Sequence, residues 1–144
     1  MGLGQRPQWN RLVAEMMVSD YPTSLDWWTR LVGMTPVFTR PAQKLAFLQH
    51  PDGAQVMIYE RDGDWEVAAM EPPFGRGVVI QVFVDDVVAV HRRFAAAHHA
   101  FYVDLREKWR DWGDVLGGQR EFLVQDPDGY LVMVAQHIGT RPLT

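Results

Sequence analysis

Few side chains in this chain could do chemistry, and their positions follow no motif of covalent catalysis. The sequence has five His and no Cys. His91, His98 and His99 lie in or just after a predicted helix, His50 precedes a predicted turn, and His137 follows the last predicted strand. These scattered positions are typical of surface histidines, not of a metal site or of a base beside a nucleophile. We therefore predict no catalytic residue.

A second group of polar side chains could bind a ligand without changing it. Glu15, Gln55, Tyr59 and Gln81 each lie in an apolar run typical of a strand, where alternate residues share one face. A carboxylate on an inner sheet face needs a partner or water. Glu15 is therefore a counter-ion for a cationic or amide-rich ligand, half of a structural salt bridge with an Arg, or an exposed residue on a hydrated sheet face. The amides and the phenol would donate and accept hydrogen bonds in the same site.

Aromatic side chains could supply the apolar part of such a site. Phe83 is expected on the same strand face as the polar group above. Trp109 and Trp112 lie in residues 106–118, a segment too polar and too rich in glycine for a core strand. Two Trp in such a segment favour an aromatic wall for a flat ligand, or a subunit interface.

The elements that position these residues occur twice in the chain. An apolar strand closed by an acid is found at Leu12–Asp20 and again at Val78–Asp86. A Pro-Asp-Gly turn followed by a second apolar strand is found at Pro51–Glu60 and again at Pro127–Gln136. The second copy carries about ten extra residues in its middle, and this repeat indicates two related modules.

Between these markers each copy has the pattern of a helix and further strands. Pro22–Val32 and Val87–Ala97 have apolar residues at helical spacing, and Thr35–Thr39 and Lys44–Leu48 are β-type runs. The fold class is therefore α+β, with two tandem βαβββ modules that form a cupped mixed β-sheet with helices on its outer face. Within one domain of residues 1–144, we predict module one at about 11–60, a linker at 61–76 and module two at about 77–137.

The composition excludes several classes of function. A net charge of -4 opposes sequence-independent binding to nucleic acid and weakly favours cationic ligands. No apolar run is long enough for a membrane span, and the first residues lack the apolar core of a signal peptide. Without Cys, disulfides and thiolate metal sites do not form. We expect a cytoplasmic protein that binds neither membrane nor nucleic acid.

Residues 18–34 and 120–136 resemble the vicinal oxygen chelate superfamily of glyoxalases, extradiol dioxygenases and antibiotic resistance proteins. The resemblance extends over about residues 12–136 and is strongest to the bleomycin resistance type, through residues 14–20 and 112–122. Enzymes of the superfamily hold a divalent metal on the strands that face the cup. The corresponding positions here are Val13, Met57, Val79 and Met133, which offer no nitrogen or oxygen ligands. We therefore predict neither a metal nor another cofactor.

The resemblance implies a homodimer whose clefts sequester a bulky cationic or aromatic molecule, such as a bleomycin-type antibiotic, without chemical change. The residues expected to line the cleft are Glu15, Gln55, Tyr59, Gln81, Phe83, Trp109 and Trp112. Two alternatives are an enzyme of the same fold, with relocated metal ligands or with Glu15 as a general base, and a regulatory module that contacts another protein through the Trp-bearing segment.

Overall fold

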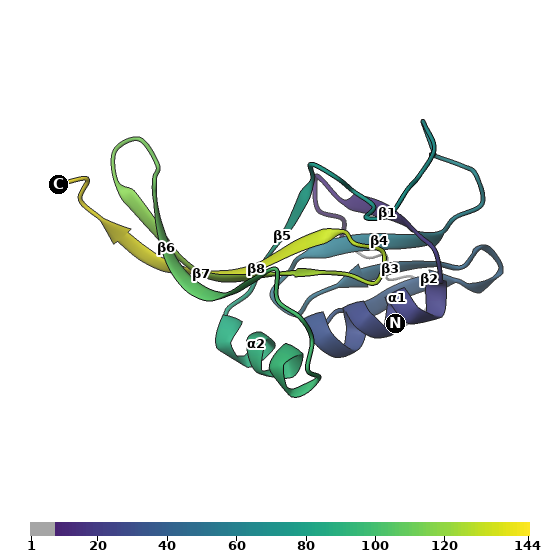
Figure 1. The fold of residues 1–144 in the computed structure, drawn as a ribbon, viewed down its shortest axis with the longest axis horizontal. Helices are drawn as coiled ribbons and strands as arrows, with labels where there is room; N and C mark the ends of the chain where they lie inside the picture. The colour runs from purple at the N-terminus through teal and green to yellow at the C-terminus, as the bar shows by residue number, and fades with distance from the viewer. Residues whose placement is uncertain (1–7) are drawn as a thin grey trace. The chain divides into compact units, whose positions relative to one another are not determined.

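The computed structural model describes residues 8–144 and confirms the α+β class with two βαβββ repeats (Figure 1). The chain divides into two compact units: unit 1 ends at Phe74, and unit 2 begins at Gly75. Each unit has one four-stranded mixed sheet, named sheet 1 and sheet 2 after its unit. The repeat found in the sequence is therefore a repeat in structure.

Sheet 1 has the strand order β1-β4-β3-β2. Strand β1 is parallel to β4, and the pairs β4–β3 and β3–β2 are antiparallel. The elements are β1 (Ala14–Val18), α1 (Tyr21–Asp26), the π-helix η1 (Trp27–Val32), β2 (Thr35–Arg40), the 3₁₀ turn η2 (Pro41–Gln43), β3 (Leu45–Gln49) and β4 (Gln55–Glu60).

Unit 2 repeats this arrangement with the strand order β5-β8-β7-β6. Its elements are β5 (Val79–Phe83), α2 (Val87–Ala96), β6 (Val103–Asp111), β7 (Leu116–Gln125) and β8 (Leu131–Arg141). The last three strands have 9, 10 and 11 residues, whereas β2, β3 and β4 have 6, 5 and 6. The extra residues of the second copy therefore lengthen three strands. Residues 106–111 and 116–118, expected to be too polar and too rich in glycine for a core strand, lie in β6 and β7, and β6 is the edge strand of the sheet.

The helices begin and end where local chemistry favours it. The carboxylates of Asp20 and Asp86 accept hydrogen bonds from backbone N–H groups three residues further on, Thr23 and Ala89. Gly33 ends the first helical segment with a φ of 92°, a conformation that costs glycine little. The aspartate that follows the first strand of each unit is thus also the N-cap of the next helix.

The two Pro-Asp-Gly turns are built alike but use different residues to bind the turn backbone. The Asp128 N–H donates to Oδ1 of Asp126 at 3.0 Å, and the Asp52 N–H donates to Nδ1 of His50 at 3.1 Å. His50 is only 6% exposed, so the prediction that it is a surface histidine is wrong. It serves as a buried turn acceptor.

Each sheet has one face towards its helix and one face away from it, named the open face. In unit 2, Phe122 of β7 packs edge-on against Phe94 of α2, with ring centroids 5.4 Å apart. In unit 1, Glu60 of β4 accepts from the Tyr21 N–H at the start of α1 at 3.0 Å. Because side chains alternate along a strand, Glu121 and Leu123, and likewise Gln55, Met57 and Tyr59, are on the open faces.

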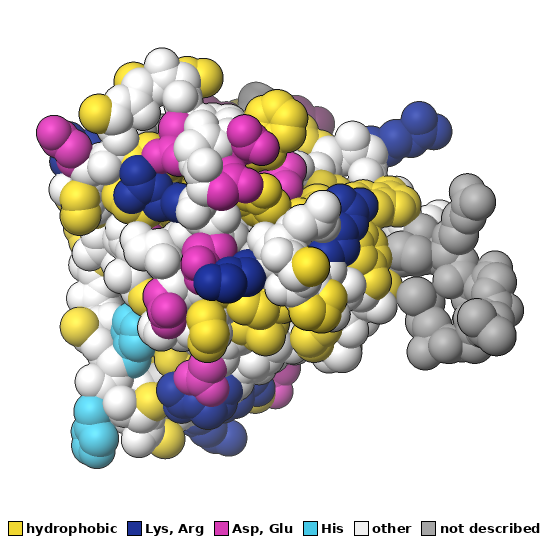
Figure 2. All heavy atoms as spheres, turned by 90° about the vertical axis from the view of Figure 1, so that its right-hand side faces the viewer, with side chains coloured by type: hydrophobic (Ala, Val, Ile, Leu, Met, Phe, Trp, Pro, Cys, Tyr) yellow, Lys and Arg dark blue, Asp and Glu magenta, His cyan; other side chains and the backbone are white. Residues whose placement is uncertain are grey.

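The exposed surface is mixed in character. On the face drawn in Figure 2, acidic side chains gather in the upper half, with apolar side chains between and beside them. Trp65 and Val67 in the segment before unit 2 are among the exposed large apolar residues. No helix in residues 8–144 is long and apolar enough to cross a membrane.

Candidate functional site

Three aromatic side chains form a row on the open face of sheet 2. The Phe83 ring stacks on the His137 imidazole with centroids 4.7 Å apart and planes 10° apart. The Trp112 indole meets the same imidazole nearly edge-on, at 5.9 Å and 81°. Phe83 is 38% exposed and Trp112 is 48% exposed. The row therefore leaves aromatic surface available to a planar ligand.

The long strands of unit 2 explain how this row forms. His137 was expected after the last strand, but β8 continues to Arg141 and includes it. Its backbone pairs with Gln119 of β7, which places both side chains on the open face. Trp112 lies over Gly117, where an added Cβ would come within 2.0 Å of the indole. The glycine leaves room for the indole against the sheet.

Trp109 does not share this surface. It packs over Gly118, where an added Cβ would lie 2.6 Å from its ring. Gly117 and Gly118 are adjacent in one strand, so their Cα–H bonds point to opposite faces of the sheet. Trp109 instead lies under the guanidinium of Arg141, 3.7 Å from the ring centroid. The structure thus separates the two tryptophans that were predicted to form one wall, and Trp109 is not part of the aromatic row.

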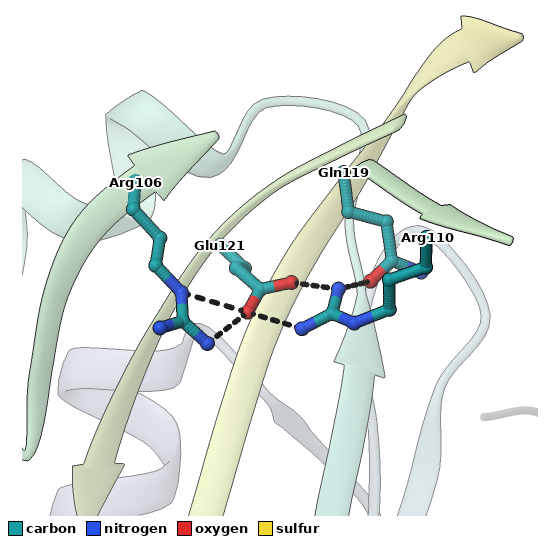
Figure 3. A network of polar contacts seen from close by, with 4 residues as sticks. All are labelled: Arg106, Arg110, Gln119 and Glu121. Atoms are coloured by element: carbon teal, nitrogen blue, oxygen red, sulfur yellow. Dashed lines mark hydrogen bonds and ion pairs between the residues drawn. The ribbon is translucent and has the colours of Figure 1, made fainter. Parts of the chain in front are cut away.

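Beside the aromatic row, Glu121 lies completely buried between two arginines (Figure 3). Its Oε2 accepts from Arg106 Nη2 at 3.0 Å and from Arg110 Nη2 at 2.9 Å, and its Oε1 accepts from Arg110 Nη1 at 2.5 Å. Arg110 Nη1 also donates to Oε1 of Gln119 at 3.0 Å. The hydrogen bond from Arg110 is the largest cause that holds the pKa of Glu121 below its ordinary value, against the opposite effect of burial.

Glu121 and His137 were not among the predicted site residues. Glu121 stands in the apolar run of β7 in the same way as Glu15 stands in β1, so strand alternation alone could have found it. Its two arginines are on the neighbouring strand, and their pairing depends on a register that includes a shift between Val103 and Arg106. Such a shift has no clear signal in the sequence.

On the open face of sheet 1, Glu15 is exposed and is paired in register with Met57. Tyr59 on the same face donates its hydroxyl hydrogen to the carboxylate of Asp62. That hydrogen bond is the main cause that raises the pKa of Tyr59 to about 12, with burial and the charges of Asp62, Asp64 and Glu15 adding to it. Tyr59 is therefore a protonated hydrogen-bonding group at neutral pH, and this part of unit 1 is acidic.

Gln55 has a structural role in this conformation. Its Oε1 accepts from the Asn10 N–H at 2.7 Å, and its Nε2 donates to the Gln8 carbonyl at 2.7 Å. These bonds fix residues 8–10 against the open face of sheet 1, where the Trp9 ring packs on Phe47 with centroids 4.3 Å apart. The amide groups of Gln55 are thus already engaged by the chain itself.

Gln81 remains available on the open face of sheet 2. It is exposed and is paired in register with Met133. Met133 packs with Leu123 and Ala135 in a small apolar cluster on this face. Gln81 and the aromatic row therefore border an apolar floor, whereas Glu15, Gln55 and Tyr59 belong to the other unit.

The donor set does not fit the divalent metal of related enzymes. The positions expected to hold it carry two valines and two methionines, Val13, Met57, Val79 and Met133. Within residues 8–144, no three His, Asp or Glu side chains are grouped so as to hold a metal ion. The side chains at these positions therefore support no metal-dependent step.

Residues 10–134 match the family model described as "Glyoxalase/Bleomycin resistance protein/Dioxygenase superfamily". The chain belongs to this superfamily. Its fold resembles that of TioX from Micromonospora sp. ML1, at 25% identity and a TM-score of 0.67, over 90% of this chain and 99% of TioX.

Two further solved structures share the fold. A glyoxylase/bleomycin resistance protein/dioxygenase domain from Frankia sp. EAN1pec is 17% identical, with a TM-score of 0.61, over 93% of this chain and all of that chain (100%). A glyoxalase/bleomycin resistance protein/dioxygenase from Alicyclobacillus acidocaldarius is 15% identical, with a TM-score of 0.61, over 90% of this chain and 92% of that chain. A search among curated proteins finds no match.

Proposed function

We propose that this protein is a small-molecule binding protein of the bleomycin resistance type, which sequesters a bulky aromatic or cationic molecule without changing it chemically. The observation that carries the proposal is the exposed row of Phe83, His137 and Trp112 on the open face of sheet 2. Aromatic rings exposed over an apolar floor are suited to stacking on a planar ligand.

The chemistry of the open faces supports binding more than catalysis. The positions that hold a metal in related enzymes are apolar here. Tyr59, with a pKa of about 12, is not a base at neutral pH. Glu121 is engaged by two guanidinium groups, which stabilise its carboxylate form and make it a poor proton acceptor. Sequestration requires none of these groups to react.

Unit 1 supplies the features that favour a cationic group. Glu15 is exposed on its open face, and Asp62 and Asp64 act on the nearby Tyr59 together with Glu15. Three carboxylates in one region attract cations more strongly than scattered surface charges do. We propose Glu15 as the counter-ion for a cationic ligand group.

Equilibrium dialysis of the purified protein against metal-free bleomycin tests the proposal. The protein should retain bleomycin on its own side of the membrane, and the ligand recovered after denaturation should have an unaltered mass. If the protein retains neither bleomycin nor a neutral aromatic amide such as 2-naphthamide, the proposal that it binds small molecules is contradicted. A changed mass of the recovered ligand would contradict sequestration and favour an enzyme.

A further inference from the structure

We infer that the open face of sheet 2 recognises an aromatic ring that carries an anionic group, a carboxylate or a sulfonate. The anion would bind to Arg106, Lys108 and Arg110 on β6, and the ring would stack on the aromatic row. This inference rests on the proposed function, since it concerns the same surface, and it assigns to unit 2 the opposite ligand charge from that proposed for Glu15.

The register of sheet 2 gives this face a basic half and an aromatic half. One row across the strands pairs Arg106 with Glu121, Glu121 with Ala135, and Ala135 with Phe83. The next row pairs Lys108 with Gln119, and Gln119 with His137. Each row therefore runs from a cation on β6 to an aromatic ring on β8 or β5.

The positive charge of this face is not fully neutralised by the chain. The register places Arg106, Lys108 and Arg110 on it, and two of these cations are paired with the one carboxylate of Glu121. Lys108 is exposed and has no ion-pair partner within the described residues. The side chains of Arg106 and Arg110 are 39% and 36% exposed, so they can contact a ligand while they hold Glu121. In a chain of net charge -4, this face is locally positive.

The distance between the two halves suits a small aromatic acid. Neighbouring strands lie about 4.8 Å apart, so a ring over β8 is about 5 to 10 Å from a cation over β7 or β6. The floor between them includes Ala135, which is fully buried, and the apolar side chains of Leu123 and Met133. An ion pair formed over such a floor is screened less than one in open solvent.

Three probes with the same ring and different charge test the inference: 2-naphthoate, 2-naphthamide and 2-naphthylmethylammonium. In isothermal titration at low salt, 2-naphthoate should bind about tenfold more tightly than the amide, as expected for a hydrogen-bonded charge. The ammonium compound should bind more weakly at this face than either. Equal affinity for 2-naphthoate and 2-naphthamide would overturn the inference and leave the proposed function intact. If none of the three binds, the inference fails, and the proposed function fails with it only when bleomycin is not retained either.

Two variants connect the preference to this face. Lys108→Gln should weaken 2-naphthoate binding about threefold and leave 2-naphthamide unaffected. Arg92→Gln, which removes one exposed charge from α2, is the matched control and should change neither. An equal loss in both variants would mean that only net charge matters, and would overturn the assignment to this face.

Glu121→Gln keeps the shape of the side chain but removes its charge. If the carboxylate of Glu121 competes with a bound anion for the two arginines, this variant should bind 2-naphthoate more tightly while its affinity for 2-naphthamide is unchanged. If the folded variant binds 2-naphthoate more weakly than wild type, the two arginines pair with Glu121 and do not bind the anion, and the inference is overturned.

Discussion

Glu121 is fully buried, and its two oxygens are held by guanidinium groups whose side chains are each more than a third exposed. The buried carboxylate therefore orients Arg106 and Arg110 along one face of the sheet, because both donate hydrogen bonds to it. Burial opposes its charge, and the arginines offset that cost. The same contacts that stabilise unit 2 also hold its cations in position.

Replacing one of these arginines should destabilise the fold. Arg110→Gln leaves Glu121 buried with a single cationic partner, and we expect the free energy of unfolding to fall by about 2 kcal/mol, less than for a fully buried pair because Arg110 is partly exposed. Urea unfolding at neutral pH measures this loss.

The pH dependence provides a second check on the same variant. The folded-state pKa of Glu121 is lowered, so the stability it contributes is present above its ordinary value of 4.5 and is lost as the pH falls through the folded-state pKa. The difference between wild type and Arg110→Gln should shrink accordingly in acid. If the difference in free energy of unfolding between wild type and Arg110→Gln is independent of pH, the loss does not come from the charge of Glu121. The same conclusion follows if Arg92→Gln gives an equal loss.

Asp126, at the second Pro-Asp-Gly turn, should have the opposite pH dependence. Burial raises its pKa to about 6, although the N–H groups of Asp128 and Tyr130 donate to its Oδ1. A folded-state pKa above the unfolded value means that the folded state binds more protons, so stability falls as the pH rises from about 4 to 6.

The variant Asp126→Asn keeps an oxygen for both N–H groups and has no charge to bury. Relative to this variant, wild type should lose about 2 kcal/mol in free energy of unfolding between about pH 4 and pH 8. Urea unfolding of both proteins at the two pH values measures the change. If the free energy of unfolding changes equally with pH in wild type and in Asp126→Asn, the pKa of Asp126 is not raised.

At the scale of elements, the β6–β7 hairpin determines which aromatic rings reach the open face. Gly117 leaves room for Trp112 on that face, and Gly118 leaves room for Trp109 on the other. Gly117→Ala should displace the Trp112 indole and weaken bleomycin binding, because a Cβ would lie 2.0 Å from the ring. Gly118→Ala should reduce the melting temperature without a loss of affinity. Equal affinities in the two variants would contradict the separation of the two faces.

Most elements could be predicted from the sequence because their signals are local. Apolar residues at helical spacing locate both helices, and alternating apolar residues locate the strands of unit 1. The long strands of unit 2 were missed, since residues 106–118 are polar and rich in glycine. They form strands because Trp109 and Trp112 pack over the glycines from both sides, and this tertiary packing overrides a weak β propensity.

At the scale of the whole molecule, the internal repeat predicts the fold, but the site depends on long-range register. Alternation correctly places Gln81 and Phe83 on the open face of sheet 2, and Glu15 on that of sheet 1. It could not show that residues 8–10 bind the amide of Gln55, because this contact joins residues 45 positions or more apart in sequence. Nor could it show that His137 links Phe83 to Trp112.

The proposed homodimer is also a property of the whole molecule. Exposed apolar side chains such as Trp65 and Val67 are candidates for burial between chains. Light scattering after size exclusion should give twice the 16.5 kDa mass of one chain. A mass of one chain at all protein concentrations contradicts the dimer but leaves the open-face site of unit 2 unaffected.

The central claim is that the row of Phe83, His137 and Trp112 binds an aromatic ligand, and isothermal titration with metal-free bleomycin tests it most directly. Trp112→Ala and Trp109→Ala are a matched pair, with the same substitution three residues apart on opposite faces. We predict that Trp112→Ala weakens binding about tenfold, as expected for the loss of one stacking contact, and that Trp109→Ala binds like wild type. Equal affinities for all three proteins, or a loss confined to Trp109→Ala, would contradict the claim.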